Sequence, residues 1–260
     1  MRYRIVDVFT HRPLSGNALC VVLDPCPEEL MPRIAREANL SETTFPTMTG
    51  PEAYRMRVFT PGSELPFAGH PTLGTAWVLG PGRWTQTTPG ATVTVEATAE
   101  GAEMSQPDPV LTPVDQEGIA EALGLPGAEG AWLSEAGGTN HVLVPTTAAL
   151  AELTPDLGAV AELAARAGGI SLCPFRRIDD RTLHVRAFLP GTGVTEDPGT
   201  GSAAGPIGVL ASRLWGVESQ VTVRQGDEIG RPCRISVRAL DGDLRVGGRV
   251  TAVAEGRWLI

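Results

Sequence analysis

Short stretches in which hydrophobic and polar residues alternate occur along the whole chain and predict β-strands. The predicted strands span residues 3–9, 18–23, 54–60, 92–97, 141–144, 182–188, 219–223, 234–237, 243–250 and 251–254. Apolar runs with helical spacing predict fewer helices, at 27–38, 72–79, 116–123, 156–167 and 202–214. Many strands and one mostly apolar helix in each half predict an α+β fold, with a curved mixed sheet around one central helix per domain.

Two stretches of the first half recur in the second half, at a spacing of about 130 residues. Residues 57–62 (RVFTPG) recur as 186–191 (RAFLPG), and 69–72 (GHPT) align with 199–202 (GTGS). Each copy reads as a short strand, a turn and the start of an apolar helix. Pro71 is expected at the first helical position, where the missing N–H of proline is not required. Matches in the same order at a nearly constant spacing predict a duplicated domain.

The repeat divides the chain into two predicted domains. Residues 1–110, together with a C-terminal strand at about 248–260, form the first domain, and residues 116–247 form the second. The segment 106–112 is the candidate linker, because prolines cluster there and interrupt regular structure.

The composition excludes several classes of protein. The net charge of −9 argues against nucleic acid or an anionic membrane as a partner, and no apolar run is as long as a membrane span. The N-terminal residues MRYRIVDVF lack the apolar core of a signal peptide, so we expect a cytoplasmic protein. All 21 basic residues are arginine, which excludes a lysine Schiff base and the lysine of a phosphate-binding loop.

The residues that most often bind metals are scattered along the sequence. Four cysteines and four histidines occur without a C-x-x-C pair or an H-E-x-x-H motif. Because metal sites usually show such spacings, we expect no metal, and the cysteines are expected to be buried thiols.

Both repeated helices begin in glycine-rich loops, at residues 67–70 (FAGH) and 197–202 (DPGTGS). A helix N-terminus directs unpaired N–H groups and the positive end of its dipole outward, so such a loop can hold a carboxylate or a phosphate. The same glycines could serve only to allow tight turns between strand and helix. Two related loops that face each other across a cleft favour the binding site.

Several stretches together resemble the signature of the PhzF (phenazine biosynthesis) family. They are residues 7–10 (DVFT), 16–17 (GN), 39–45 (NLSETTF), 64–76 (ELPFAGHPTLGTA), 196–203 (EDPGTGSA), 225–226 (QG) and 230–232 (GRP). The resemblance implies a diaminopimelate-epimerase-like fold, in which two pseudo-symmetric domains enclose the active site. It also implies a homodimer and an enzyme that needs neither a metal nor an organic cofactor.

The resemblance assigns roles to three side chains that would otherwise read as ordinary. Glu42 alone would be a solvated surface charge, but it matches the catalytic acid/base glutamate of the family. His70 matches a substrate-contacting histidine, although a lone histidine is more often a packed or capping residue. Asp197 could merely cap the second helix, but it matches an acidic group that binds substrate.

The other candidate residues lie in the two loops and are expected to bind the substrate. They are Gly69, Pro71, Gly199, Thr200, Gly201 and Ser202. We expect the backbone N–H groups of Gly69, Gly201 and Ser202 to hold a carboxylate. Because neither loop contains a cysteine, a racemase with two thiol bases is not expected, and a single carboxylic acid that moves one proton fits better.

The predicted function is a cofactor-independent isomerase that shifts a proton and a double bond in a small cyclic carboxylate. An epimerase and a catalytically silent binding protein of the same fold remain alternatives. A nucleotide-binding protein is a weaker alternative. Gly199, Gly201 and Gly205 approximate a dinucleotide fingerprint, but an acidic loop precedes them and no βαβ array surrounds them.

Overall fold

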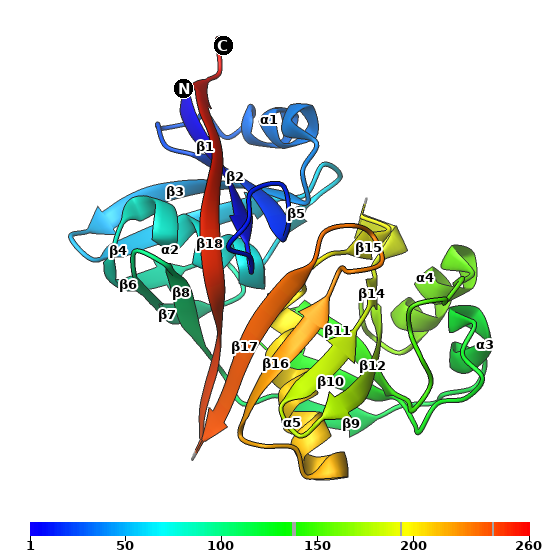
Figure 1. The fold of residues 1–260 in the computed structure, drawn as a ribbon. Coiled ribbons are helices and arrows are strands. Elements are labelled where there is room, and N and C mark those ends of the chain that lie inside the picture. Colours follow the sequence, from blue (N-terminus) through cyan, green and yellow to red (C-terminus); the bar gives the residue numbers. More distant parts are fainter. Residues whose placement is uncertain (137–138, 193, 241) are drawn as a thin grey trace.

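The computed structural model describes residues 1–136, 139–192, 194–240 and 242–260. The fold is α+β, because one continuous mixed sheet curves around two helices, α2 (Gly69–Leu79) and α5 (Gly201–Trp215). The fold class predicted from the sequence is therefore confirmed. The long strand β18 (Asp243–Arg257) runs along both halves, and the two chain ends lie side by side at one end of it (Figure 1).

The remaining elements are short. The strands are β1 (Arg2–Val8), β2 (Asn17–Val22), β3 (Glu42–Gly50), β4 (Ala53–Phe59), β5 (Glu64–Leu65), β6 (Gly82–Thr87), β7 (Thr92–Ala97), β8 (Gly101–Gln106), β9 (Val110–Pro113), β10 (Trp132–Ala136), β11 (Thr139–Pro145), β12 (Leu172–Asp179), β13 (Thr182–Val185), β14 (Ala187–Phe188), β15 (Glu196–Asp197), β16 (Gln220–Gln225) and β17 (Cys233–Leu240). The helices are α1 (Met31–Ala38), α3 (Ile119–Leu123), α4 (Leu157–Arg166) and the 3-10 helix η1 (Pro190–Thr192). In Figure 1, α3 and α4 lie together on the outside of the second half.

The order in which strands pair is the same in both halves. In the first half, β1 to β2 is antiparallel, β2 to β3 parallel, β3 to β4 antiparallel and β4 to β6 parallel, and β6, β7 and β8 continue antiparallel. In the second half, β10, β11, β12, β13, β16, β17 and β18 pair in the same series of directions. The two halves are therefore pseudo-symmetric.

Strand β18 belongs to the sheet of both halves. Its residues 250–257 pair with β1, whereas residues 243–247 pair with β17 on one side and residues 244–249 with β8 on the other. The division into domains 1–110 with 248–260, and 116–247, stays a prediction.

The two central helices are buried because they are apolar on nearly every side. α2 packs against β1, β2, β3, β7 and β8, and α5 packs against β10, β11, β12 and β17. A glycine permits this close approach of α2 to the sheet. A Cβ at Gly74 would lie 2.6 Å from Leu19 Cδ2 and 2.9 Å from Val8 Cγ2. Such helices are stable only inside a sheet or a core, which is where both are found.

The repeated Arg-x-Phe stretch forms the same local structure in each half. Arg57 donates to both carboxylate oxygens of Glu64, at 2.7 and 2.8 Å. Arg186 likewise donates to both oxygens of Glu196, at 2.8 Å each. Each guanidinium also lies over the ring of the phenylalanine two residues further on, at 5.1 and 4.9 Å. The short repeat in the sequence therefore corresponds to a repeat in the structure.

The starts of the two central helices differ from the prediction. Pro71 is the third residue of α2, not the first, because the helix begins at Gly69. The third N–H of a helix also has no partner within the helix, so proline is equally compatible there. Because α5 begins at Gly201, His70 corresponds to Ser202 in position along its helix. The alignment of residues 69–72 with 199–202 that the sequence suggested is therefore off by two residues, because Gly69 corresponds to Gly201 in the structure.

Some strand predictions are also corrected. The strand expected at 182–188 is divided at Arg186 into β13 and β14, and those expected at 243–250 and 251–254 are one strand. The later part of the proposed linker forms β9, which pairs with β10. Strand β3 was not predicted, because its sequence ETTFPTMTG lacks a clear alternation.

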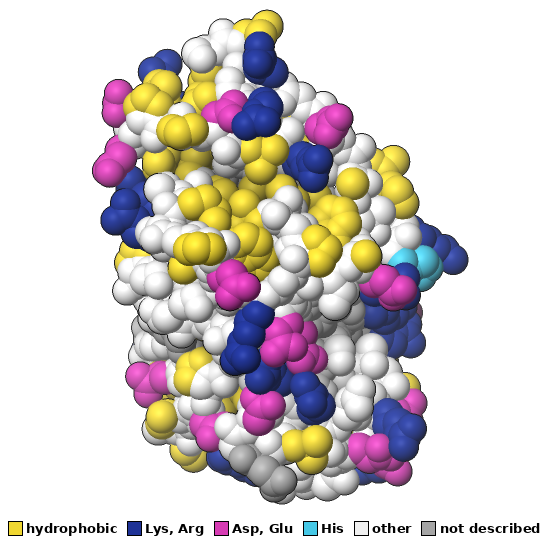
Figure 2. Space-filling model, turned by 90° about the vertical axis from the view of Figure 1, so that its left-hand side faces the viewer, with side chains coloured by type: hydrophobic (Ala, Val, Ile, Leu, Met, Phe, Trp, Pro, Cys, Tyr) yellow, Lys and Arg dark blue, Asp and Glu magenta, His cyan; other side chains and the backbone are white. Residues whose placement is uncertain are grey.

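Apolar side chains gather on one face of the first half. Figure 2 shows them on the face that carries β4, β6 and β7, with charged side chains both above and below them.

Among the residues that the structure describes, no helix has the length and apolar character needed to cross a membrane.

Candidate active site

The N-termini of α2 and α5 meet between the two halves, and a small cavity lies beside them. Gly69 and Gly201, the first residues of these helices, are in direct contact, since a Cβ on Gly69 would lie 2.7 Å from the carbonyl carbon of Gly201. Residues of both halves line the cavity, among them Glu42, His70 and Asp197. The positive ends of two helix dipoles therefore face a space that contains two carboxyl groups.

Glu42, the first residue of β3, lies beside His70, the second residue of α2. Glu42 Oε2 is 3.1 Å from His70 Nε2, and the two side chains are 12% and 4% exposed. Although they are this close, the two atoms are not aligned for a hydrogen bond, and neither has a hydrogen bond to another described residue. Buried polar atoms without a partner are rare, and they are expected where a ligand binds.

The protonation states of this pair follow from burial. Burial raises the pKa of Glu42 well above its usual 4.5, and the nearby carboxylate of Asp197 raises it further. Burial lowers the pKa of His70 to about 3, so its imidazole is neutral at neutral pH. The site therefore places a neutral imidazole next to a carboxyl group that holds its proton to an unusually high pH.

Asn17, the first residue of β2, joins the two halves at this point. Its Nδ2 lies 3.0 Å from His70 Nδ1, 2.8 Å from Asp197 Oδ1 and 3.0 Å from the carbonyl oxygen of Gly199. Because an amide nitrogen only donates, we assign His70 Nδ1 as an acceptor and the ring proton to Nε2, the nitrogen nearer Glu42. Asn17 thus sets both the tautomer of His70 and the position of Asp197.

Asp197 is held in place at the entrance to α5. Thr200 Oγ1 donates to Asp197 Oδ2 at 2.6 Å, and Gln225 Nε2 donates to the Asp197 carbonyl oxygen at 2.7 Å. Burial raises the pKa of Asp197, although hydrogen bonds from Thr200 and Asn17 act in the opposite direction. The carboxylate has a fixed orientation as a result.

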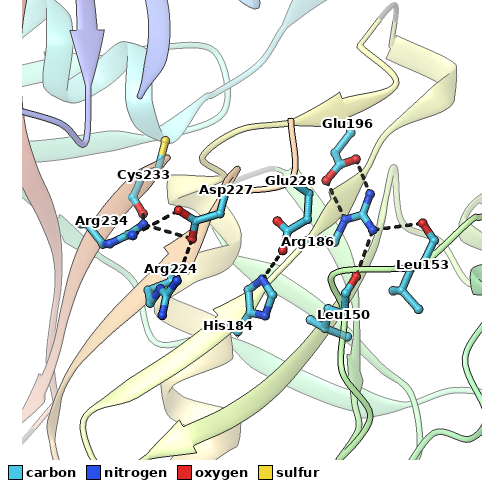
Figure 3. Close-up of polar contacts among 10 residues, drawn as sticks. All are labelled: Leu150, Leu153, His184, Arg186, Glu196, Arg224, Asp227, Glu228, Cys233 and Arg234. Carbon is cyan, nitrogen blue, oxygen red and sulfur yellow. Dashed lines mark hydrogen bonds and ion pairs between the residues drawn. The ribbon is translucent and has the colours of Figure 1, made fainter. Parts of the chain in front are cut away.

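A buried ion pair anchors the strand that carries Asp197. Figure 3 shows Arg186 bound to both oxygens of the neighbouring Glu196 and to the carbonyl oxygens of Leu150 and Leu153. The Arg186 and Glu196 side chains are only 8% and 11% exposed. Charge-assisted bonds with this fork geometry restrict orientation, so the network stabilises β15 and with it Asp197.

Ser202, the second residue of α5, belongs to a second buried polar group at the cavity. Its Oγ lies 2.8 Å from His141 Nε2, and His141 Nδ1 lies 2.7 Å from Ser171 Oγ. Burial lowers the pKa of His141 to about 4, so this imidazole is also neutral at neutral pH.

The structure brings most of the candidate residues together but leaves two outside the cavity. Those that line it are Glu42, Gly69, His70, Asp197, Thr200, Gly201 and Ser202. Pro71 is buried within the first turn of α2 and is not among the lining residues. Gly199 is packed instead against Phe9 and Cys233, since a Cβ there would lie 2.9 Å from Phe9 Cδ2 and 2.7 Å from Cys233 Sγ.

The sequence did not single out Asn17 and His141 as site residues. Asn17 lies in a signature stretch, and Asn17 and Asn140 each stand at the start of a short hydrophobic strand, so the repeat itself was a signal. His141 directly follows Asn140 and points into the cavity region from β11. A comparison of the strand starts in the two halves would have drawn attention to both residues.

Metal and thiolate chemistry find no support in the arrangement of side chains. Across residues 1–136, 139–192, 194–240 and 242–260, no group of histidine, cysteine, aspartate and glutamate residues is placed to hold a metal ion. Burial raises the pKa of Cys173 and of Cys20 to about 12, so both remain thiols at neutral pH.

The lowered pKa of His141 predicts a loss of stability in acid. The unfolded chain binds a proton at this histidine below about pH 6.5, whereas the folded protein does so only near pH 4. The free energy of unfolding should therefore fall by about 3 kcal/mol from this residue between pH 7 and pH 4. Urea unfolding of wild type and His141→Gln at several pH values shows how steeply the free energy of unfolding of each protein changes with pH, and the slope should be smaller for the variant. His11→Gln, at an exposed position, is the control for replacing a histidine by glutamine.

The fold is the one found in epimerases of known structure, and the candidate site lies between its two similar halves. A hydroxyproline epimerase from Agrobacterium vitis shares the fold, with a TM-score of 0.63, 12% identity and coverage of 98% of this chain and 90% of that one. The PhzF-family phenazine biosynthesis protein of Bacillus anthracis is more similar, with a TM-score of 0.86, 26% identity and coverage of 100% and 99%.

The chain belongs to the phenazine biosynthesis-like protein family, whose model matches residues 6–256. The trans-2,3-dihydro-3-hydroxyanthranilate isomerase of Pseudomonas aeruginosa is 37% identical over 288 aligned positions, which cover 98% of each protein. Relatives of the same name occur in Pseudomonas chlororaphis and Pseudomonas fluorescens. The chain is accordingly an isomerase.

Proposed function

We propose that this enzyme shifts a proton and a double bond in a small cyclic carboxylate, with Glu42 as the general acid and base. The observation that carries the proposal is the position of the Glu42 carboxyl group. It is buried, its Oε2 lacks a hydrogen-bond partner among the described residues, and it faces the cavity at the helix N-termini. A desolvated carboxyl group with a raised pKa is suited to take a proton from carbon and to return it.

The helix N-termini would stabilise the charge that develops when the proton leaves. As a C–H bond breaks, its electron pair delocalises toward the ring and the carboxylate of the substrate. The first N–H groups of α2 and α5, at Gly69 and Gly201, have no acceptor within their own helices and can hold that carboxylate. Protonated Glu42 then donates its proton to a different carbon, which completes the shift of the double bond. No electrons are gained or lost in this reaction.

At the position equivalent to Glu42, the second half carries Leu172. In the parallel pair β2–β3, Glu42 stands opposite Leu19, and in the equivalent pair β11–β12 the residue opposite Val142 is Leu172. Leu172 is fully buried and cannot exchange a proton. The arrangement favours one acid/base group that acts at two carbons over two bases on opposite faces, as an epimerase would need.

The cavity must widen before a substrate can enter. Its free volume is about 30 Å³, which is room for one or two water molecules and not for a six-membered ring. We infer that the two halves separate to admit the substrate and then close. Closure would exclude water from Glu42 and strengthen each electrostatic contact in the site.

The substrate class rests on the curated relatives and on Asp197. Relatives are named for the isomerisation of trans-2,3-dihydro-3-hydroxyanthranilate, which carries an amino group next to its carboxylate. We propose an amino-bearing cyclic acid of this kind, with Asp197 accepting hydrogen bonds from the amino group. The homodimer and the location in the cytoplasm stay predictions that rest on resemblance and on composition.

Incubation with trans-2,3-dihydro-3-hydroxyanthranilate in heavy water tests the proposal. We expect a product that contains deuterium at the newly protonated carbon, detected by NMR and mass spectrometry. Uptake should be incomplete, because a proton held in a closed cavity can be returned before it exchanges. Prior dialysis against EDTA should leave the rate unchanged. The protein would instead be a silent binding protein if it neither turned over this compound or other amino-bearing cyclic acids nor exchanged their carbon-bound hydrogen.

A further inference from the structure

A chain of buried polar groups leads from the core of the second half to the cavity. Cys173 Sγ lies 3.3 Å from Ser171 Oγ, which lies 2.7 Å from His141 Nδ1, and His141 Nε2 lies 2.8 Å from Ser202 Oγ. Ser202 and His141 line the cavity, whereas Ser171 is completely buried behind them. No step of the proposed reaction requires His141 or Ser171, so their arrangement calls for a separate explanation.

The hydrogen bonds of this chain can run in one of two directions. A neutral imidazole carries one N–H and one acceptor nitrogen. If His141 Nδ1 donates to Ser171, then Nε2 accepts the hydroxyl hydrogen of Ser202, and only lone pairs of Ser202 face the cavity. If Ser171 donates to Nδ1, then Nε2–H donates to Ser202 Oγ, and the hydroxyl hydrogen of Ser202 is left to point into the cavity.

We propose that His141 and Ser171 are positioning residues that orient the hydroxyl of Ser202 so that it donates a hydrogen bond to the carboxylate of the substrate. The ligand decides between the two directions, because a carboxylate only accepts hydrogen bonds. This inference rests on the proposed function in taking the ligand to be a carboxylate.

Cys173, at the other end of this row of hydrogen-bonded side chains, is consistent with hydrogen bonds that all donate toward the cavity. Cys173 remains a thiol at neutral pH, because burial raises its pKa to about 12, so its S–H is present to donate to Ser171 Oγ. Successive donors that point the same way polarise and strengthen one another. Ser202 is also the second residue of α5, where the helix dipole favours an anion. The hydroxyl and the backbone N–H groups of the helix start would then bind the same carboxylate.

Binding of two matched small molecules tests the proposal. Anthranilate carries a carboxylate, and anthranilamide has the same shape with a neutral amide. For Ser171→Ala we expect anthranilate to bind about tenfold more weakly in calorimetry, the loss typical of a hydrogen bond to a charged group, and anthranilamide to change less than about twofold. Ser171 does not touch the ligand, so only a change in the orientation of Ser202 explains a selective loss. Ser202→Ala should likewise weaken the binding of anthranilate much more than that of anthranilamide.

A matched variant separates this role from a loss of packing. Ser134 in β10 is also a buried serine, and its Oγ has no hydrogen bond to a described residue. Ser134→Ala should leave the affinity ratio of the two compounds unchanged. An unchanged ratio in Ser171→Ala, or no binding of anthranilate by the wild type, would overturn the proposal.

The tautomer of His141 gives a second readout that does not depend on activity. In protein labelled with ¹⁵N-histidine, the His141 signals are those lost in His141→Gln. We expect the proton on Nε2 when anthranilate is bound to the wild type, and a proton on Nδ1 in that complex would contradict the proposed direction. In His141→Gln the amide nitrogen can still donate to Ser202, so this variant should keep the selectivity of the wild type for anthranilate. His141→Leu should lose it.

The two proposals can fail separately. If the wild type isomerises its substrate but Ser171→Ala keeps the wild-type affinity ratio, the inference about orientation is wrong and the proposed function stands. If anthranilate binding shows the predicted selectivity but no turnover of any cyclic amino acid is found, the proposed function fails and the orientation of Ser202 stands.

Discussion

Replacement of Glu42 by glutamine is expected to lower kcat by about 10²–10⁴-fold, the usual loss when a general acid/base is removed. The amide has nearly the same shape as the carboxyl group, so the fold and ligand binding should be kept. It cannot accept a proton at working pH, so neither half of the proton shift can proceed. Steady-state kinetics in parallel with anthranilate binding measures the two effects separately.

A second substitution in the same cavity serves as the comparison. Asp197→Asn also removes a carboxylate, but Asp197 is proposed to bind the amino group and not to transfer the proton. Its main effect should therefore be a higher KM, and that of Glu42→Gln a lower kcat. If Glu42→Gln turns over at nearly the wild-type rate, the base is wrongly assigned and Asp197 is the next candidate.

The pH profile of the wild type provides an independent check on Glu42. Because burial and Asp197 raise the pKa of this carboxyl group, the ionised base is formed only at a pH clearly above 4.5. The acidic limb of kcat/KM, which reports the free enzyme, should accordingly lie above that value.

The parts of the fold that were predicted from the sequence are those that depend on local pattern. Every second residue of Thr92–Ala97 is buried, and β7 has the bounds that the alternation predicted. The helix predicted at 202–214 is observed as Gly201–Trp215, because its apolar run ends at a glycine in the left-handed conformation. The Arg-x-Phe repeat predicted equivalent structures in the two halves, and each arginine indeed binds a glutamate further along the chain.

The parts of the site that were missed depend on contacts between distant residues. Asn17 bonds to His70 and Asp197, which lie 53 and 180 residues away in sequence. His141 meets Ser202 across 61 residues. An asparagine or histidine at the start of a strand carries no local mark of such a contact. Only the fold, by placing β2 and β11 beside the two helix N-termini, gives these side chains their roles.

The contact between the two helix N-termini leaves no room for a side chain at position 69, so Gly69→Ala should damage the protein. The added Cβ would lie 2.6 Å from Ser202 N and 2.7 Å from the carbonyl carbon of Gly201, and backbone atoms cannot rotate away as a side chain can. The helix starts must therefore move apart by several tenths of an ångström. Such overpacking typically costs 1–3 kcal/mol, more than the roughly 1 kcal/mol that alanine gains over glycine in a helix.

Activity should suffer more than stability, because the same atoms are proposed to hold the carboxylate. A displacement of about 1 Å in a positioning group can cost about 10²-fold in rate, and we expect a loss of this order in kcat/KM for Gly69→Ala. Gly201→Ala should be milder, since its Cβ would lie 3.1 Å from Phe9 Cζ and 3.3 Å from the Gly69 carbonyl carbon. Gly127→Ala, where the Cβ meets nothing within 4 Å, is the control. Thermal unfolding and kinetics of the three variants test this order, and equal effects at positions 69 and 127 would show that the helix starts are not in contact.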